Sequence, residues 1–128
     1  MRAVGPFLLI FVFLAVTHCV STKREASGDR SSEIDREIIL EKGITRSAYE
    51  AVQSLRPVWL RGRGPTSYGG SQHPKVYVDG MHRRGLPKEA LGKISVQRVK
   101  AIRFLGAGEA TMRFGSGHEN GVILVITR

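Results

Sequence analysis

The chain has a single cysteine among its 128 residues, so an intramolecular disulfide is impossible. Histidines are also few, and no two stand at the spacing of metal ligands; they are His18, His73, His82 and His118. We expect the last three to be exposed loop residues. A Gly-x-Ser-x-Gly elbow for a catalytic serine is absent, and no pair of carboxylates is placed for acid–base work. The sequence therefore predicts no metal site, no catalytic residue and no enzymatic activity.

A complete glycine-rich nucleotide loop is also lacking. The segment LGAGEAT follows a predicted strand and precedes a predicted helix, which is where a dinucleotide-binding loop would lie. Thr111 stands in place of the third glycine, which such loops need for close packing of the helix against the strand. We therefore expect no cofactor.

Acidic side chains are scarce, because 11 aspartates and glutamates stand against 20 lysines and arginines, a formal net charge of +9. The basic residues are spread evenly through the chain from Arg56 to Arg113. An even spread of basic residues is typical of a solvated surface. Nucleic-acid binding is the more specific alternative. An exported protein seldom meets nucleic acid, so we expect the basic surface to face anionic lipid headgroups instead.

The chain has only one long apolar run, residues 3–16, which carries no charge and follows Arg2. These 14 residues are fewer than the ~20 that a membrane-spanning helix needs. Their length and flanks are typical of a secretory signal, so we expect residues 1–18 to be a signal peptide that is removed on export. An N-terminal anchor that stays uncleaved is the alternative.

Cys19 lies just after this run, in the segment VTHCV. The segment resembles the lipobox of bacterial lipoproteins, in which the cysteine becomes the lipid-modified N-terminus. Two or more acyl chains on Cys19 would hold the protein stably at a membrane. His18 stands where the lipobox has a small residue, and ordinary signal peptidase cleavage, for instance after Ser21, is the alternative. We expect lipidation of Cys19.

Residues 19–33 are predicted to be a flexible tether, because the segment TKREASGDRSSE within them has one apolar residue. The folded domain is then expected over residues 34–128. It begins with a predicted short helix, IDREIILEKG, in which Asp35 is the N-cap and Ile34 is stapled against Ile39. A strand at residues 38–40 is the alternative.

The segment ITRSAYEAVQSLRP, residues 44–57, gives the clearest helical pattern in the chain. Ser47 and Glu50 form a possible capping box, and Pro57 marks the end of the helix. Small apolar residues recur on one face, which predicts a helix packed closely on a sheet: Ala48, Ala51, Val52 and Leu55. The following segment, residues 61–74, is rich in glycine and proline and is predicted to be a loop.

A β-hairpin is predicted from KVYVDGMHRRG. Val76 and Val78 alternate with polar residues, as in a strand with one buried face. Asp79 and Gly80 follow at once, and an Asp-Gly pair is a strong signal for a type I′ turn, which needs positive φ at both positions.

Further elements complete the predicted domain. A short helix begins at Pro87, a helical turn at Ser95 leads into a strand over residues 99–105, and GAGEATMRF predicts another short helix. Residues 122–126 are apolar without interruption and rich in β-branched side chains, which predicts a strand buried on both faces. The order of elements predicts a small α+β domain with a mixed β-sheet and short helices.

Four segments in this order, VYVDG, VQRVKAIRFL, FGSG and NGVILVITR, resemble the plug domain of TonB-dependent outer-membrane receptors. In that family a strand ending in Asp-Gly precedes a strand ending Arg-Ile-Glu-Val-Leu. An aromatic-Gly-Ser-Gly turn, two glycines and a final strand follow. Here Phe114 is the aromatic residue, and Gly115, Gly117 and Gly121 are the expected structural turn positions beside Asp79 and Gly80. The resemblance covers residues 34–128 approximately.

The resemblance implies a plug-like binding module in the bacterial cell envelope, at the periplasmic face of the outer membrane or at another envelope membrane. The family's barrel does not follow in this sequence, so we expect a protein that is not itself a transporter. The loop at residues 61–74 and the turn GSGHENG are the candidate binding surfaces for an envelope protein or a small ligand. Two alternatives remain: an accessory subunit that docks on a separately encoded barrel, and a truncated receptor remnant.

Overall fold

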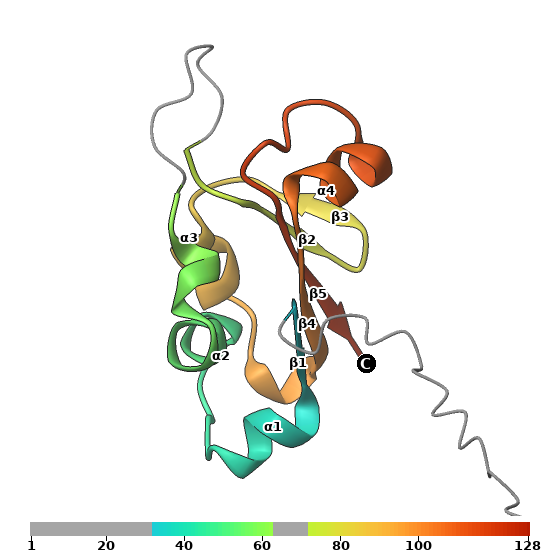
Figure 1. The fold of residues 1–128 in the computed structure, drawn as a ribbon. Coiled ribbons are helices and arrows are strands. Elements are labelled where there is room, and N and C mark those ends of the chain that lie inside the picture. Colours follow the sequence, from blue (N-terminus) through green and yellow to red (C-terminus); the bar gives the residue numbers. More distant parts are fainter. Residues whose placement is uncertain (1–31, 63–71) are drawn as a thin grey trace, which may run out of the picture.

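The computed structural model describes residues 32–62 and 72–128 (Figure 1). The predicted signal peptide, Cys19 and the predicted tether up to residue 31 lie outside the described residues, as does the centre of the loop at 61–74. In the described part, no helix combines the length and the apolar character that a membrane crossing requires.

Within the described residues, five strands form one mixed sheet in the order β1-β4-β5-β2-β3. Their bounds are β1 Glu33–Asp35, β2 Lys75–Val78, β3 Met81–Arg83, β4 Val99–Leu105 and β5 Val122–Thr127. Strand β5 lies at the centre, antiparallel to β4 and parallel to β2, and the other neighbouring pairs are antiparallel. The predicted α+β class with a mixed sheet is therefore confirmed.

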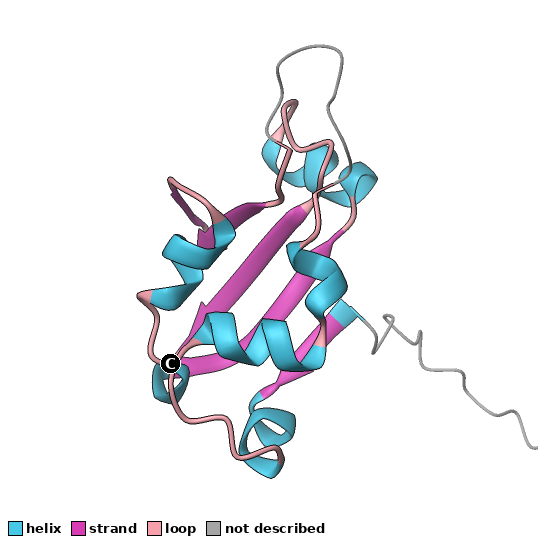
Figure 2. Ribbon diagram, turned by 90° about the vertical axis from the view of Figure 1, so that its left-hand side faces the viewer, coloured by secondary structure: helices cyan, strands magenta, loops and turns pink. Residues whose placement is uncertain are grey.

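The helices lie mainly on one side of this sheet, as Figures 1 and 2 show. They are α1 Arg36–Glu41, α2 Ala48–Leu55, α3 Pro87–Gly92 and α4 Ala107–Phe114, with 3₁₀ turns η2 Pro57–Leu60 and η3 Val96–Arg98. Helices α1, α2 and α3 cover one face, whereas α4 packs beside the opposite face near the start of β5. The face away from α1, α2 and α3 is called the open face below.

Helix α2 begins as the sequence predicts, at Ser47. The Ser47 hydroxyl accepts a hydrogen bond from the backbone N–H of Glu50 at 3.3 Å, and the Glu50 carboxylate accepts one from the backbone N–H of Arg46 at 3.3 Å. In the standard capping box the Glu50 side chain would bond to the backbone N–H of the N-cap residue, Ser47. Here it bonds to the residue before, Arg46. Ala48 and Ala51 are fully buried, because their small side chains let the helix approach the sheet closely.

The start of the domain differs from the prediction, because a short strand precedes the first helix. Ile34 pairs with Ile102 of β4, and α1 begins only at Arg36. Asp35 occupies the N-cap position without a side-chain capping bond, whereas the expected partners Ile34 and Ile39 are both buried in the same core. The alternative of a strand at residues 38–40 is wrong, because these residues are helical.

The Arg36 guanidinium attaches this first segment to the sheet. Its Nη1 donates hydrogen bonds to the carbonyl oxygens of Gln97 at 3.0 Å and Val99 at 3.1 Å. Bonds from a charged donor are stronger than neutral ones, so this contact holds the start of α1 beside the start of β4.

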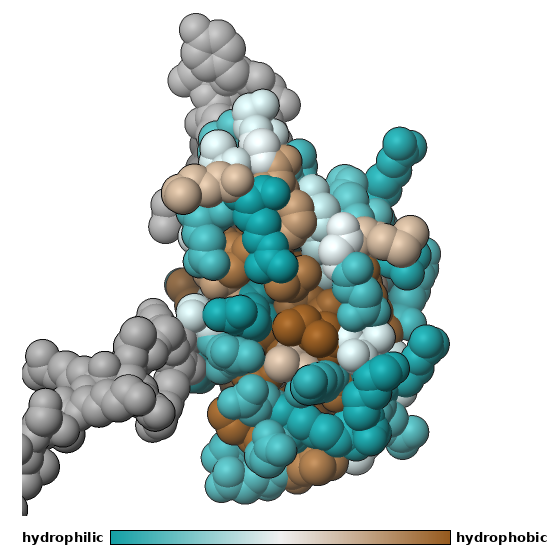
Figure 3. Space-filling view, turned by 90° about the vertical axis from the view of Figure 1, so that its right-hand side faces the viewer, coloured by the Kyte–Doolittle hydropathy of each residue, from teal (hydrophilic) through white to brown (hydrophobic). Residues whose placement is uncertain are grey.

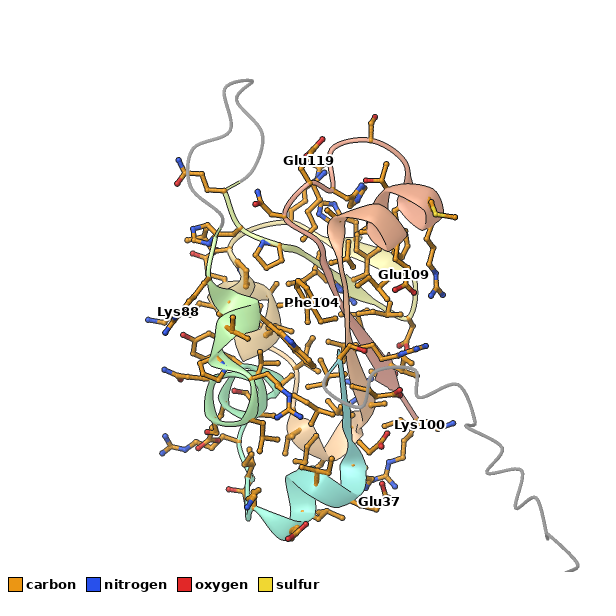
Figure 4. All side chains as sticks on the ribbon, in the orientation of Figure 1. Glu37, Lys88, Lys100, Phe104, Glu109 and Glu119 are labelled. Atoms are coloured by element: carbon orange, nitrogen blue, oxygen red, sulfur yellow. The ribbon has the colours of Figure 1, made fainter. Side chains whose placement is uncertain are left out.

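Side chains of β5 alternate between the two faces of the sheet, as the sequence predicts. Ile123 and Val125 face the helices and join the larger core, which also contains Val76 and Ile102 from the neighbouring strands. Phe104, which is labelled in Figure 4, extends this core. Its ring stacks on Trp59 of η2 with centroids 5.7 Å apart.

The side chains that β5 directs to the open face of the sheet are also buried at Val122 and Leu124. Val122 packs in a smaller cluster with Ala110 of α4. Leu124 lies in register between Arg103 of β4 and Tyr77 of β2, and only 4% of it is exposed. The predicted burial on both faces is confirmed for these residues.

Truncation on either face of β5 is expected to destabilise the domain by a similar amount. Ile123→Ala and Leu124→Ala should each lower the free energy of unfolding by about 2–5 kcal/mol, the range for emptying a packed aliphatic site. Ile126→Ala should lower it less, because Ile126 is partly exposed near the end of the strand. Urea unfolding followed by circular dichroism measures all three free energies.

A difference above about 2 kcal/mol between Ile123→Ala and Leu124→Ala would show that one face of β5 is in water, contrary to the structure. The wild-type transition serves as a further check. A cooperative transition is expected from a single core, whereas a broad non-cooperative one would favour the receptor-remnant alternative.

Candidate functional site

Two turns carry the glycines and the aspartate that the sequence singles out, and the first is the β2–β3 hairpin. Asp79 has φ 50° and Gly80 has φ 83°, so both central residues adopt the left-handed conformation that a type I′ turn needs. The Asp79 carboxylate also accepts two hydrogen bonds from Thr127, from its backbone N–H at 2.8 Å and from its hydroxyl at 2.6 Å. Asp79 therefore attaches the hairpin to the end of β5.

The second turn, GSGHENG, joins α4 to β5. Gly115, Gly117 and Gly121 have φ values of 86°, 87° and 81°, which L-residues with a side chain rarely adopt. A Cβ atom on Gly121 would also lie 2.6 Å from the carbonyl oxygen of Leu105 and 2.8 Å from the Phe104 ring. Gly121 is therefore required both by its backbone conformation and by the close approach of β4.

His118 is not the exposed loop residue that the sequence predicts, because it is 5% exposed within this turn. Its Nδ1 lies 2.8 Å from the carbonyl oxygen of Gly115, and its Nε2 lies 2.9 Å from the hydroxyl of Tyr77. A carbonyl oxygen only accepts, so neutral His118 carries its proton on Nδ1 and accepts at Nε2 from Tyr77. The Phe114 ring stacks on Tyr77 at 4.1 Å, so the turn is held together from inside.

A cavity of about 510 Å³ opens at the β3 edge of the sheet, between the hairpin and the segment from α3 to η3. Four cationic side chains line it: Arg83, Arg84, Lys93 and Arg98. Asp79 and Thr127 contribute the hydrogen-bonded contact described above, and His82 lines the cavity from β3. The cavity therefore lies beside the carboxyl ends of the parallel strands β2 and β5.

Within residues 32–62 and 72–128, none of these four cations has an ion-pair partner. The ion pair in this part of the chain joins Arg103 to Glu33 at 3.5 Å, on the open face. Among the described residues, Asp79 is the one carboxylate in the cavity wall, against four cations. A hollow lined by one sign of charge concentrates the electric field and attracts counter-ions. The cavity is therefore strongly electropositive.

Two titratable groups of the cavity, Asp79 and His82, have pKa values below their ordinary values. Hydrogen bonds from the Thr127 hydroxyl and then from the Thr127 backbone N–H lower the pKa of Asp79, and Arg98 and Arg83 add to this. Burial lowers the pKa of His82, and the positive charges of Lys75 and Arg84 act in the same direction. At neutral pH Asp79 is therefore ionised and His82 is uncharged.

The cavity was not predicted from the sequence, where the basic residues suggest an evenly charged surface. The fold concentrates cations from the end of β3, the end of α3 and η3, which are separated along the chain. The adjacent pair Arg83 and Arg84, where β3 ends, is the one local signal. Of the two predicted binding surfaces, residues 63–71 of the loop lie outside the described residues, and the GSGHENG turn is braced internally by His118.

No family model, curated protein or solved structure matches this chain. Within the described residues, no group of three or more histidine, cysteine, aspartate or glutamate side chains could hold a metal ion.

Removal of the Thr127 hydroxyl is expected to destabilise the domain in a pH-dependent way. Because the lowered pKa of Asp79 contributes stability above the unfolded value of 3.8, that contribution is lost as the pH falls through the folded pKa. Thr127→Val should therefore lower the free energy of unfolding by about 0.5–1 kcal/mol at pH 7, a modest value because Asp79 is exposed. Urea unfolding at a series of pH values measures the difference.

Thr127→Ser keeps the hydroxyl and serves as the matched control, with little expected change at any pH. An equal destabilisation of Thr127→Val at pH 7 and well below pH 3.8 would show that the effect does not come from the hydrogen bond between the Thr127 hydroxyl and the ionised Asp79 carboxylate.

Proposed function

We propose that this chain is a non-enzymatic binding module of the bacterial cell envelope, similar to the plug domain of TonB-dependent receptors. The observation that carries the proposal is the arrangement of the segments on which the resemblance rests. VYVDG forms β2 and the hairpin turn, AIRFL ends β4, and VILVIT is β5, so the three strands are neighbours in one sheet.

The turn between these strands supports the same proposal. The family pattern has two glycines before the last strand. Here Gly121 has a positive φ that disfavours any side chain, and a Cβ atom on it would collide with β4. The correspondence therefore falls on a position with a physical requirement for glycine, and not only on matching letters.

The binding role is supported by the cationic cavity at the hairpin. Its volume of about 510 Å³ lies within the range of small-molecule sites, which run from about 300 to 1,000 Å³. The module would bind its ligand there, on a scaffold held by the contact between Asp79 and Thr127.

Lipidation of Cys19 would place this module at a membrane and provides the first test. Metabolic labelling with a palmitate analogue in a Gram-negative host should label the wild-type chain and move it to the membrane fraction, because two acyl chains bind a bilayer stably. Cys19→Ala should lose both the label and the membrane association. Equal labelling of the two proteins, or a wild type found only in the soluble fraction, would contradict the proposal.

An accessory subunit that docks on a separate barrel is a second candidate function, favoured by the open face of the sheet. Figure 3 shows hydrophobic side chains in the middle of this face, ringed by hydrophilic ones. Ile126 lies two residues after Leu124 on β5 and therefore on the same face, and it is partly exposed, so it is available to a protein partner.

Cross-linking in intact envelopes separates the two functions. If docking occurs through the open face, an outer-membrane barrel protein should be recovered with the wild type and lost with Ile126→Asp. Leu40→Asp is the matched control, because Leu40 is 60% exposed on α1, which covers the other face of the sheet, and an aliphatic side chain is again replaced by a carboxylate. Recovery that is equal for all three proteins would contradict docking through this face and leave the binding module as the function.

A further inference from the structure

We propose that the cationic cavity at the β2–β3 hairpin is a binding site for the phosphate group of a small organic ligand. The site consists of Arg83, Arg84, Lys93 and Arg98 around a hollow with apolar residues in its wall. The inference rests on the proposed binding function and deepens it by naming the class of ligand.

The chemistry of the four cations favours phosphate. Guanidinium groups present planar pairs of N–H donors that match phosphate oxygens, and an ammonium group adds a compact charge. A phosphate monoester carries nearly two negative charges and three strong acceptor oxygens. Four cations with one carboxylate leave a surplus of three positive charges, more than a single carboxylate ligand would neutralise.

Asp79 offsets one of the four positive charges and leaves the other three without a carboxylate in the described wall of the cavity. Both of its oxygens already accept hydrogen bonds from Thr127, at 2.8 and 2.6 Å, so its role is to hold β5 against the hairpin. This contact fixes the two strand ends that border the cavity. A ligand would therefore meet a site whose backbone is held in place before binding, which lowers the entropy lost on association.

The size and the wall of the cavity indicate that the ligand is larger than a free phosphate ion. About 510 Å³ holds a small organic molecule, and Val78, Ala90 and Ile94 provide apolar contacts inside the wall. The phosphate would lie against the cations and the organic part against these side chains. Both a soluble phosphorylated metabolite and a phosphorylated lipid headgroup have this chemistry.

Purified full-length protein that has been produced without its lipid permits a direct test, with inorganic pyrophosphate as the soluble probe. Isothermal titration calorimetry at low salt should show saturable binding by the wild type. Arg84→Gln combined with Lys93→Gln should weaken that binding about tenfold or more, because two charged donors are removed from the site. Both side chains are exposed and neither makes a hydrogen bond or ion pair within the described residues, so the fold should be kept.

The matched control removes the same charge outside the cavity. Lys88 and Lys100 project away from the domain on different sides in Figure 4, and neither lines the cavity. The double variant Lys88→Gln, Lys100→Gln should bind pyrophosphate within about twofold of the wild type. Thermal unfolding of all three proteins checks that the two double variants remain folded.

Equal weakening in the two double variants would overturn the proposal, because it would show that only net charge matters. Absence of saturable wild-type binding at millimolar pyrophosphate would overturn it as well. Because this measurement needs neither lipidation nor a membrane, its failure leaves the envelope location of the chain to be judged by the Cys19 labelling.

Vesicles distinguish the two sources of the phosphate. Phosphatidylcholine vesicles containing phosphatidic acid should bind the wild type and not the Arg84, Lys93 variant if a headgroup enters the cavity. Saturable pyrophosphate binding without this cavity-dependent vesicle binding would support a soluble phosphorylated ligand. Either result agrees with phosphate recognition at the cavity.

Discussion

Strand β5 is paired along both edges and covered on both faces. Its backbone hydrogen bonds and its apolar side chains on both faces therefore determine where the other elements lie. Ile123 and Val125 need the layer of α1, α2 and α3, whereas Val122 needs α4 on the opposite side. The edges need β4 and β2, and the parallel pairing with β2 brings two carboxyl ends together. Asp79 then reaches Thr127 and closes the hairpin onto β5. The cavity therefore follows from the position of β5.

Elements with a local signal could be predicted from the sequence. The hairpin has its Asp-Gly pair, α2 has Ser47 and a stripe of small residues, and β5 has its apolar run. Strand β1 has no such signal, because Ile34 is the one apolar residue among its three. It exists through pairing with β4, whose residues lie more than 60 positions away along the chain. Pairing at such a distance leaves no periodicity in the short segment itself.

The candidate site could not be predicted for a related reason. The fold brings the basic side chains of the cavity together, whereas the sequence shows only that basic residues are frequent. Arg84 and Lys93 line one cavity because the segment from the hairpin through α3 turns back on itself at the sheet edge. His118 illustrates the opposite error, since a polar residue between glycines suggests an exposed turn. Its burial depends on Tyr77, which lies 41 positions earlier in the chain.

The two ends of β5 differ in how well their polar groups are satisfied, and this difference indicates where a ligand would act. At the start of β5, His118 makes a hydrogen bond with each ring nitrogen, and Gly121 fits closely against β4. At the end of β5, four like charges stand with one carboxylate that is already engaged. Like charges held together oppose folding, and a ligand that binds only the folded state stabilises it by mass action. An anion in the cavity would remove that repulsion, so binding and stability should be coupled at the hairpin end and independent of the glycine turn.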